Sequence, residues 1–332
     1  MRLVIGILEK LLLCRLQEFT KNDKSRFVAA NEPERALVKS LTIPEYSFSD
    51  GAKIEGTIDT IDKLQNNKEE VDKKRSAIKN EVLIPILQQF NLGLKEVLDG
   101  DLTEGIAEVI DTGSTGRYSN APGDGDFDFM MKLDRKITKD KGQLEEIRKE
   151  FCKKLGRKYS DIIKDGNVRA KNVKLQGLEE LVDIDVTFAT KTNKVKYSTD
   201  VALKQFYESM TEEQKNNTTA NVVFAKRFLK HIKAYKPDRG DTPQGGLGGV
   251  GIENWVLQNG GSFVVAAESF MKVANECGDN FEKFKANYSL IDFGENHQGG
   301  KNDNFVTRNM SKEGYDKMRT ALGDFLEKQK IG

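Results

Sequence analysis

Two short acidic segments carry the side chains best suited to chemistry. GDFDFMMKL contains Asp126 and Asp128, and LVDIDVTFA contains Asp183 and Asp185. Residues two apart in a β-strand point to the same side, so each pair of carboxylates can converge on one point. Carboxylate oxygens suit Mg²⁺, and two such ions can bridge the attacking and leaving oxygens of an in-line displacement at phosphorus. The segments therefore predict a metal site for nucleotidyl transfer.

A small turn precedes the first acidic segment. Gly113 and Ser114 lie shortly before Asp126, and their backbone N–H groups and hydroxyl could approach a phosphate closely. The later segment offers Asp183 and Asp185 as the third carboxylate, and either could orient or deprotonate an incoming hydroxyl. An Asp-x-Asp strand by itself is typical of a solvated sheet face. The turn, the first acidic strand and the second one together favour a catalytic site.

The stretch NAPGDGDFDFMMKL, just after Gly113 and Ser114, resembles the active-site strand of cyclic GMP-AMP synthase and its bacterial relatives. These enzymes belong to the polymerase β nucleotidyltransferase superfamily. The resemblance implies that Asp126 and Asp128 are paired ligands of two Mg²⁺ or Mn²⁺ ions. IDVTFA resembles the third-aspartate strand of the same family, which favours Asp185 as the third metal ligand.

A second resemblance concerns AKRFLKHIKAY, the glycine loop after it, and then GIE and GGSF. These segments resemble the helical lobe of archaeal CCA-adding enzymes. The resemblance implies that Lys226 and Tyr235, nine residues apart, hold the triphosphate, and that Arg117 in GSTGR also contacts phosphate. From the residues alone, Lys226, Lys230 and Lys233 form a stripe typical of a solvated helix face. Tyr235 is also a candidate for stacking on a base.

Two alternating segments are expected to position the acidic residues. Both have the period of a half-buried strand, with apolar side chains on one face and aspartates on the other. The expected inward residues are Phe127, Phe129, Met131 and Leu133 in the first strand, and Val182, Ile184, Val186 and Phe188 in the second.

Helical periodicity surrounds these strands. One long helix is expected over about 69–90, kinked near Pro85. Further helices are expected over 221–235, from 253, and over 311–330, with a Pro/Gly-rich loop at 236–251. Trp255 is expected to pack in the helical lobe, and His231 and His297 to be structural.

The resemblances imply an α+β (α/β) fold of the bilobal polymerase β type. A mixed-sheet catalytic lobe would be followed by a helical lobe, with a cleft between them. We expect an N-terminal extension over 1–65, a catalytic lobe with its preceding long helix over 66–205, and a helical lobe over 206–332.

Composition and charge limit the functions and locations that are possible for the protein. Among 332 residues, 53 are basic and 52 acidic, a net charge of +1, so nothing global marks a protein that clamps long nucleic acid. Cys14, Cys152 and Cys277 are far apart, which indicates neither zinc nor disulfides and favours a reducing, cytoplasmic compartment. The apolar run LVIGILEKLLLCRL is too short and too charged for a membrane span or a signal peptide, and predicts an amphipathic helix.

Three functions follow from the resemblances. The first is an enzyme that joins nucleoside triphosphates, ATP and/or GTP, into a cyclic or short oligonucleotide signal, as the bacterial antiviral relatives do. The second is a template-independent nucleotidyltransferase acting on an RNA 3′ end, of the CCA-adding or poly(A) kind. The third is a catalytically inactive nucleotide-binding relative. Balanced charge favours the first, because it gives no sign of RNA or DNA as acceptor or activator.

Overall fold

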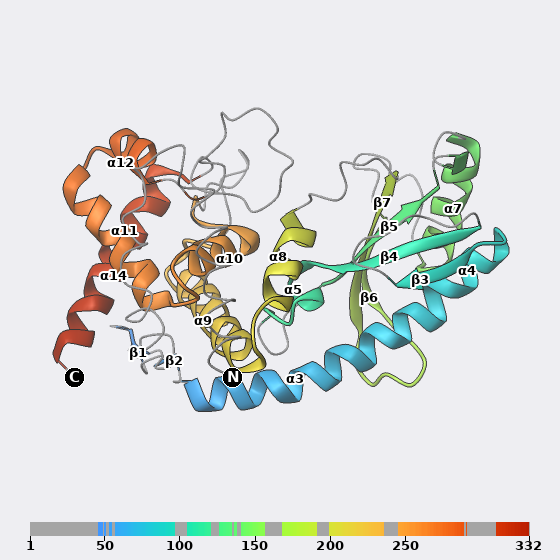
Figure 1. Cartoon of the computed structure of the whole chain (residues 1–332), viewed down its shortest axis with the longest axis horizontal. Helices are drawn as coiled ribbons and strands as arrows, with labels where there is room; N and C mark the ends of the chain where they lie inside the picture. The colour runs from blue at the N-terminus through green and yellow to red at the C-terminus, as the bar shows by residue number, and fades with distance from the viewer. Residues whose placement is uncertain are drawn as a thin grey trace, which may run out of the picture.

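The structure, a computed structural model, describes residues 46–48, 50, 53–54, 57–96, 105–120, 126–134, 136–137, 141–156, 168–190, 199–235, 245–288, 290 and 310–331. A mixed β-sheet lies at one end of the molecule and most of the helices lie at the other (Figure 1). The expected α+β architecture, a mixed sheet followed by helices, is confirmed. The N-terminal apolar run, Cys14 and His297 lie outside the described residues.

The five strands of the sheet follow the order β3-β4-β5-β7-β6. Their bounds are Gly93–Glu96 for β3, Ile106–Thr112 for β4, Phe127–Leu133 for β5, Val182–Thr190 for β7 and Val168–Val173 for β6. Central strands β5 and β7 are parallel to each other. Strand β4 runs antiparallel to β5, β6 runs antiparallel to β7, and β3 is parallel to β4. The two acidic strands are therefore neighbours.

The apolar face of the sheet covers the first hydrophobic core. All four inward residues predicted for β5 are buried there, as are Val182, Ile184 and Val186 of β7, while Phe188 is partly buried against them. Helix α7, Lys141–Lys154, packs on this core through Ile147 and Phe151. Burying this face leaves the aspartates of both strands on the opposite face.

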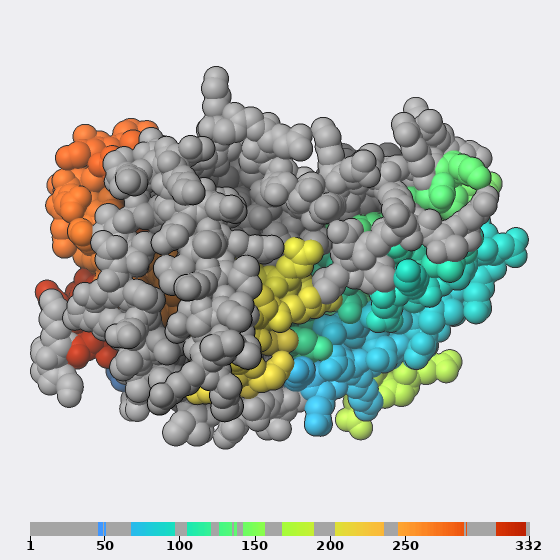
Figure 2. All heavy atoms as spheres, viewed as in Figure 1, coloured from blue at the N-terminus to red at the C-terminus, as the bar shows by residue number. Residues whose placement is uncertain are grey.

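The long helix expected over 69–90 is present and begins earlier. It consists of α3, Thr57–Ile78, a π-helical segment η1, Lys79–Leu83, and α4, Ile84–Gln89. The irregularity precedes Pro85, and Ile84 N–H reaches back to the Lys79 carbonyl, because proline has no N–H with which to continue the regular ladder. The helix runs from the helical end to the sheet (Figure 1), and the part of it that is coloured light blue to cyan lies on the surface in Figure 2.

The helical end consists of α8, Thr199–Glu208; α9, Glu212–His231; α10, Gly249–Gln258; α11, Phe263–Cys277; α12, Phe281–Asn287; and α14, Lys312–Ile331. Helix α9 starts well before the predicted residue 221, because Thr211 and Gln214 form a capping box there. It ends at His231 rather than at Tyr235. Helix α10 begins at Gly249, inside the predicted loop. The C-terminal helix is confirmed.

A second hydrophobic core joins α9, α10, α11, α12 and α14, while α8 packs against α10 in a small separate cluster of Leu203, Tyr207 and Leu257. Trp255 is fully buried and its Nε1 donates to the Tyr288 hydroxyl at 2.8 Å, which confirms its packing role. The short hairpin of β1, Tyr46–Ser47, and β2, Lys53–Ile54, adds Tyr46 to this core.

His231 stacks on Phe48 and its Nε2 lies 3.0 Å from an Asp50 carboxylate oxygen, which is the structural role expected for this histidine. Cys152 and Cys277 are buried free thiols. Across the described residues, no helix combines the length and apolar character needed to cross a membrane.

Candidate active site

Asp128 and Asp185 lie directly opposite each other on the polar face of the sheet. The parallel register of β5 and β7 pairs them, just as it pairs Phe127 with Ile184 in the core beneath. Neighbouring strands are about 4.8 Å apart, so the two carboxylates leave the same face at close spacing. Asp126 stands one residue before β5 and is exposed. The structure thus brings together the acidic segments singled out in the sequence.

The Gly113–Ser114 turn lies against this pair. It forms the short helix α5, Gly113–Gly116, between β4 and β5. Gly113 has a φ of +66°, and a Cβ atom added there would lie 1.9 Å from Asp128 Oδ2. Thr115 Oγ1 donates to the Asp126 carbonyl at 3.1 Å. The turn therefore contacts the first acidic segment at both aspartates, through the Gly113 backbone at Asp128 and the Thr115 hydroxyl at Asp126, and only glycine fits at position 113.

Asp183 and Asp185 have different partners. Asp183 Oδ1 accepts from the backbone N–H of Asn172 at 2.7 Å, where β6 departs from regular pairing. Asp185 Oδ2 accepts from Arg169 Nε at 2.5 Å, and its side chain is 17% exposed. Only Asp185 faces Asp128 in the register of the sheet. The geometry therefore gives Asp183 a structural partner and leaves Asp185 as the better candidate for a third carboxylate.

The donor set at this edge fits a hard divalent cation. Asp126, Asp128 and Asp185 supply only carboxylate oxygens, which Mg²⁺ and Mn²⁺ prefer, and Gly113 leaves room beside the Asp128 carboxylate. Among the described residues, no three His, Cys, Asp or Glu side chains already converge as ligands. Arg169 holds the Asp185 carboxylate instead, so this contact would have to change for that oxygen to bind a metal.

A buried ionic cluster joins the end of the turn to the helical part. Arg117 Nε donates to Glu253 Oε2 at 2.8 Å, and Lys226 Nζ donates to Glu253 Oε1 at 3.0 Å. The Ser119 hydroxyl donates to Glu253 Oε1 at 2.9 Å, and the Ser119 carbonyl accepts from Lys226 Nζ at 2.8 Å. Arg117 and Lys226 are only 3% and 5% exposed. Two of the side chains predicted to contact phosphate, Arg117 and Lys226, are thus bound to a protein carboxylate in this structure.

The charges of this cluster are set by its environment. Burial disfavours the ionised form of Glu253, but Arg117 and Lys226 outweigh that effect and lower its pKa to about 2. Burial lowers the pKa of Lys226, while Glu253 acts in the opposite direction. Glu253 was not among the residues singled out from the sequence. The available signal was a carboxylate within the largely apolar GIENWVL, where a charge needs a buried partner.

Lys226 and Tyr235 both lie near Gly249, the first residue of α10. A Cβ atom on Gly249 would lie 3.3 Å from the Tyr235 hydroxyl and 4.0 Å from Lys226 Cε. Both side chains therefore lie near the same position of α10, and their joint role at a triphosphate stays a prediction. The lysine stripe does not form a single solvated face, because Lys226 is buried while Lys230 and Lys233 are exposed. Lys230 Nζ lies over the Tyr235 ring, 5.4 Å from its centroid.

No protein-family model matches the chain, and no curated protein matches its sequence. Solved structures do resemble it. Cid1, described as an RNA terminal uridylyl transferase, has 16% identity over 57% of this chain and a TM-score of 0.34, and the chain spans about half, 47%, of Cid1. CdnC of Escherichia coli MS115-1, solved with ATP, has 12% identity over 80% of this chain and 89% of its own, with a TM-score of 0.48.

A third similar structure is the CdnE c-di-GMP synthase of Capnocytophaga granulosa. It has 14% identity over 94% of this chain and 91% of its own length, with a TM-score of 0.42. Similarity at these levels does not define a reaction or a substrate for this chain.

Proposed function

We propose that the chain is a metal-dependent nucleotidyltransferase of the polymerase β type, with Asp126, Asp128 and Asp185 as ligands of two Mg²⁺ or Mn²⁺ ions. The observation that carries this proposal is the direct pairing of Asp128 with Asp185 on parallel strands, with Gly113 against the Asp128 carboxylate. A solvated sheet face needs neither this pairing nor a glycine turn packed against one member of it.

The ions would supply charge neutralisation for the attacking oxygen and for the departing pyrophosphate. Asp185, whose side chain is partly exposed on β7, would orient the incoming hydroxyl and accept its proton. The N–H groups and hydroxyl of Gly113 and Ser114 would face the triphosphate. Lys226 and Tyr235, which lie near the start of α10, would oppose its negative charge together with Arg117.

For the product, we propose a cyclic or short oligonucleotide made from ATP and/or GTP. The support is the balance of 53 basic and 52 acidic residues, since an enzyme that grips a long RNA acceptor generally displays excess positive charge. Transfer of nucleotides to an RNA 3′ end is the alternative outcome of the same chemistry. The two activities differ in acceptor: another nucleotide in one, an RNA end in the other.

The decisive experiment incubates the purified chain with each α-labelled nucleoside triphosphate, alone and in pairs, with Mg²⁺ or Mn²⁺. Parallel reactions contain a single-stranded RNA with a free 3′ hydroxyl. Products are treated with phosphatase and then separated. A cyclic product has no terminal phosphate and is unchanged by the treatment, whereas a linear product loses its terminal phosphates and changes mobility. A labelled, phosphatase-resistant product formed without RNA supports the proposal.

The matched control is Asp126→Asn together with Asp128→Asn, prepared in the same way. Label that appears only on the RNA would establish the alternative. Absence of transfer by the wild-type chain under every condition, or equal transfer by the double variant, would refute the proposed site.

A further inference from the structure

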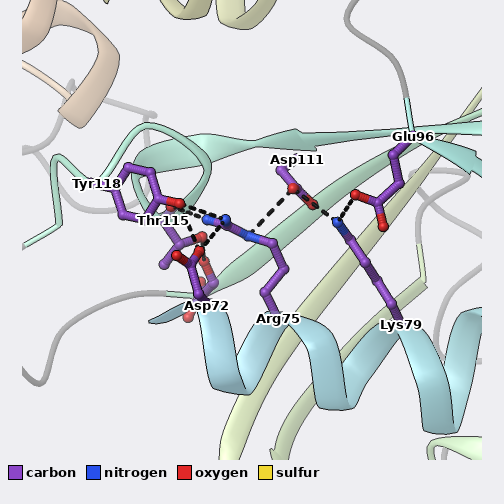
Figure 3. A network of polar contacts seen from close by, with 8 residues as sticks. Asp72, Arg75, Lys79, Glu96, Asp111, Thr115 and Tyr118 are labelled. Atoms are coloured by element: carbon purple, nitrogen blue, oxygen red, sulfur yellow. Dashed lines mark hydrogen bonds and ion pairs between the residues drawn. The ribbon is translucent and has the colours of Figure 1, made fainter. Parts of the chain in front are cut away.

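Helix α3 carries an arginine that reaches the back of the α5 turn. Arg75 extends from α3 toward Thr115 and Tyr118, as Figure 3 shows, and its Nη2 donates to the Thr115 carbonyl at 2.5 Å. Arg75 is 8% exposed although it belongs to a helix with one face on the surface. A buried guanidinium is stable only where charged and polar groups satisfy it, so its contacts define a built site.

Those contacts hold the guanidinium in one orientation. Arg75 Nη1 donates to Asp72 Oδ1 at 2.8 Å and to the Tyr118 hydroxyl at 3.1 Å, and the same hydroxyl donates to Asp72 at 2.6 Å. Arg75 Nε lies 3.4 Å from Asp111 Oδ2. Because a guanidinium presents its N–H groups in a fixed plane, these partners together set the direction of the bond to Thr115.

Thr115 connects this network to the acidic site. Its carbonyl accepts from Arg75, while its side chain donates to the Asp126 carbonyl, and Gly113 two residues earlier contacts Asp128. Arg75 is thus linked through the Gly113–Thr115 segment to the backbone of Asp126 and to the side chain of Asp128. Tyr118, in the same segment, has a φ of +55°, a strained backbone for a non-glycine residue that the surrounding contacts must maintain.

We propose that Arg75 is a positioning residue of the metal site: it fixes the Gly113–Ser119 segment so that the Asp126 and Asp128 carboxylates stay aligned. This inference rests on the proposed function for its consequence, but not for its geometry. Loss of Arg75 should loosen the segment and weaken metal use, because residues that orient ligands commonly contribute 10- to 100-fold to metal affinity.

The chain supplies a matched control one helical turn further on. Lys79 is as buried as Arg75, at 7% exposed, and also pairs with Asp111, at 3.0 Å. Its other partner is Glu96 at 2.9 Å, on β3 rather than on the turn. Lys79→Met therefore removes a buried charge from the same network without removing the bond to Thr115. Arg75→Lys keeps the charge but cannot maintain all the bonds of the guanidinium.

The test measures backbone hydrogen exchange in the full chain without nucleotide. The reporters are the amides of Arg117, Tyr118 and Ser119, which bond back to the carbonyls of Ser114 and Thr115. Arg75→Lys should accelerate their exchange by roughly 10-fold, the order expected for loss of one charged hydrogen bond. Lys79→Met should leave exchange in this segment near the wild-type value.

Tyr118→Phe provides a second, milder variant in case Arg75→Lys lowers global stability. It removes only the hydroxyl that bridges Arg75 and Asp72, and it should accelerate the same amides to a smaller extent. Equal exchange in Arg75→Lys and Lys79→Met, with Tyr118→Phe unchanged, would overturn the proposal.

The activity readout is the Mg²⁺ concentration that gives half-maximal nucleotide transfer. It should rise roughly 10- to 100-fold in Arg75→Lys, with much of the rate recovered at saturating Mg²⁺, but not in Lys79→Met. An unchanged Mg²⁺ requirement would contradict the link to the metal site. A wild-type chain that transfers no nucleotide would refute the proposed function, while hydrogen exchange would still decide whether Arg75 holds the turn.

Discussion

Asp128 on β5 and Asp185 on β7 are cross-strand partners, although 57 positions separate them in the chain. Parallel pairing places their carboxylates on the same face, and the residues beside them, Phe127 and Ile184, are both buried in the core. A slip of one residue in either strand would turn its aspartate toward the core, so hydrophobic burial fixes the register of the site.

The first prediction concerns the paired aspartates at the start of β5. Asp126→Asn together with Asp128→Asn should abolish nucleotide transfer and leave the melting temperature close to wild type. Asp126 is exposed and Asp128 partly exposed, so the change removes ligand charge from a wet site rather than from the core. Activity and thermal unfolding are measured on the same preparation. Wild-type turnover by this variant would rule out these two carboxylates as the metal ligands.

Substitution of the two aspartates of β7 should have different effects. Asp185→Ala should remove most of the activity, because Asp185 faces Asp128, whereas Asp183→Ala should mainly lower stability, because Asp183 accepts from the Asn172 N–H. A lost hydrogen bond of that type costs about 1 kcal/mol. Steady-state kinetics and chemical denaturation of both variants provide the comparison. The reverse order of activities would place the third carboxylate at Asp183.

A glycine pair tests the contact between the turn and Asp128. Gly113 and Gly177 have similar φ angles, +66° and +71°, but of the two only a Cβ on Gly113 would meet a neighbour within 4 Å. Each change to alanine should cost roughly 1–2 kcal/mol from the left-handed backbone. Gly113→Ala should in addition displace the Asp128 carboxylate and suppress transfer, while Gly177→Ala should remain active. Similar activities in the two variants would mean that the turn does not shape the site.

The triphosphate role of Lys226 requires a comparison that separates binding from folding. Lys226→Ala should lower kcat/KM for nucleoside triphosphates by roughly 10- to 1000-fold, as expected for a lost charged contact. It should also lower stability, because Glu253 loses one of its cations. Tyr235→Phe removes the hydroxyl near Gly249 and leaves the Glu253 pairs intact, so it should lower kcat/KM with little loss of stability. Exposed Lys233→Ala serves as control.

If Tyr235→Phe and Lys226→Ala both retain wild-type kinetics at temperatures where they are folded, the two residues do not hold the triphosphate. The Arg117–Glu253–Lys226 cluster would then serve only to join the turn to the helical part.

The lowered pKa of Glu253 leads to a specific prediction for how stability depends on pH. Its pKa is about 2 in the folded chain and 4.5 in the reference state, so the unfolded chain takes up the proton first as the pH falls. The stabilisation from this carboxylate is therefore complete above pH 4.5 and is lost as the pH falls to 2. Glu253→Gln should be less stable at neutral pH and should show a flatter dependence between these values. Denaturant titrations at several pH values measure both effects, and parallel curves for wild type and variant would contradict the prediction.

The local alternation of residues was sufficient to predict the two acidic strands. The alternation in FDFMMKL and VDIDVTF separates apolar from acidic side chains whatever the strands pair with, because the period of a strand is two. Helix boundaries were less well predicted. The predicted start at residue 221 falls inside α9. The helix actually begins at the capping box of Thr211 and Gln214, which was missed because it lies in a polar stretch without apolar periodicity.

The sequence by itself determined that two strands would each present aspartates on one face, since that depends only on side-chain alternation within each strand. Only the tertiary structure decided that these strands are parallel neighbours and that Asp185, not Asp183, faces Asp128. It also decided that Arg117 and Lys226 enclose the carboxylate of Glu253. Pairing between distant segments depends on the joint burial of both strands and helices, and a buried charge is stable only where its partner arrives from elsewhere in the chain.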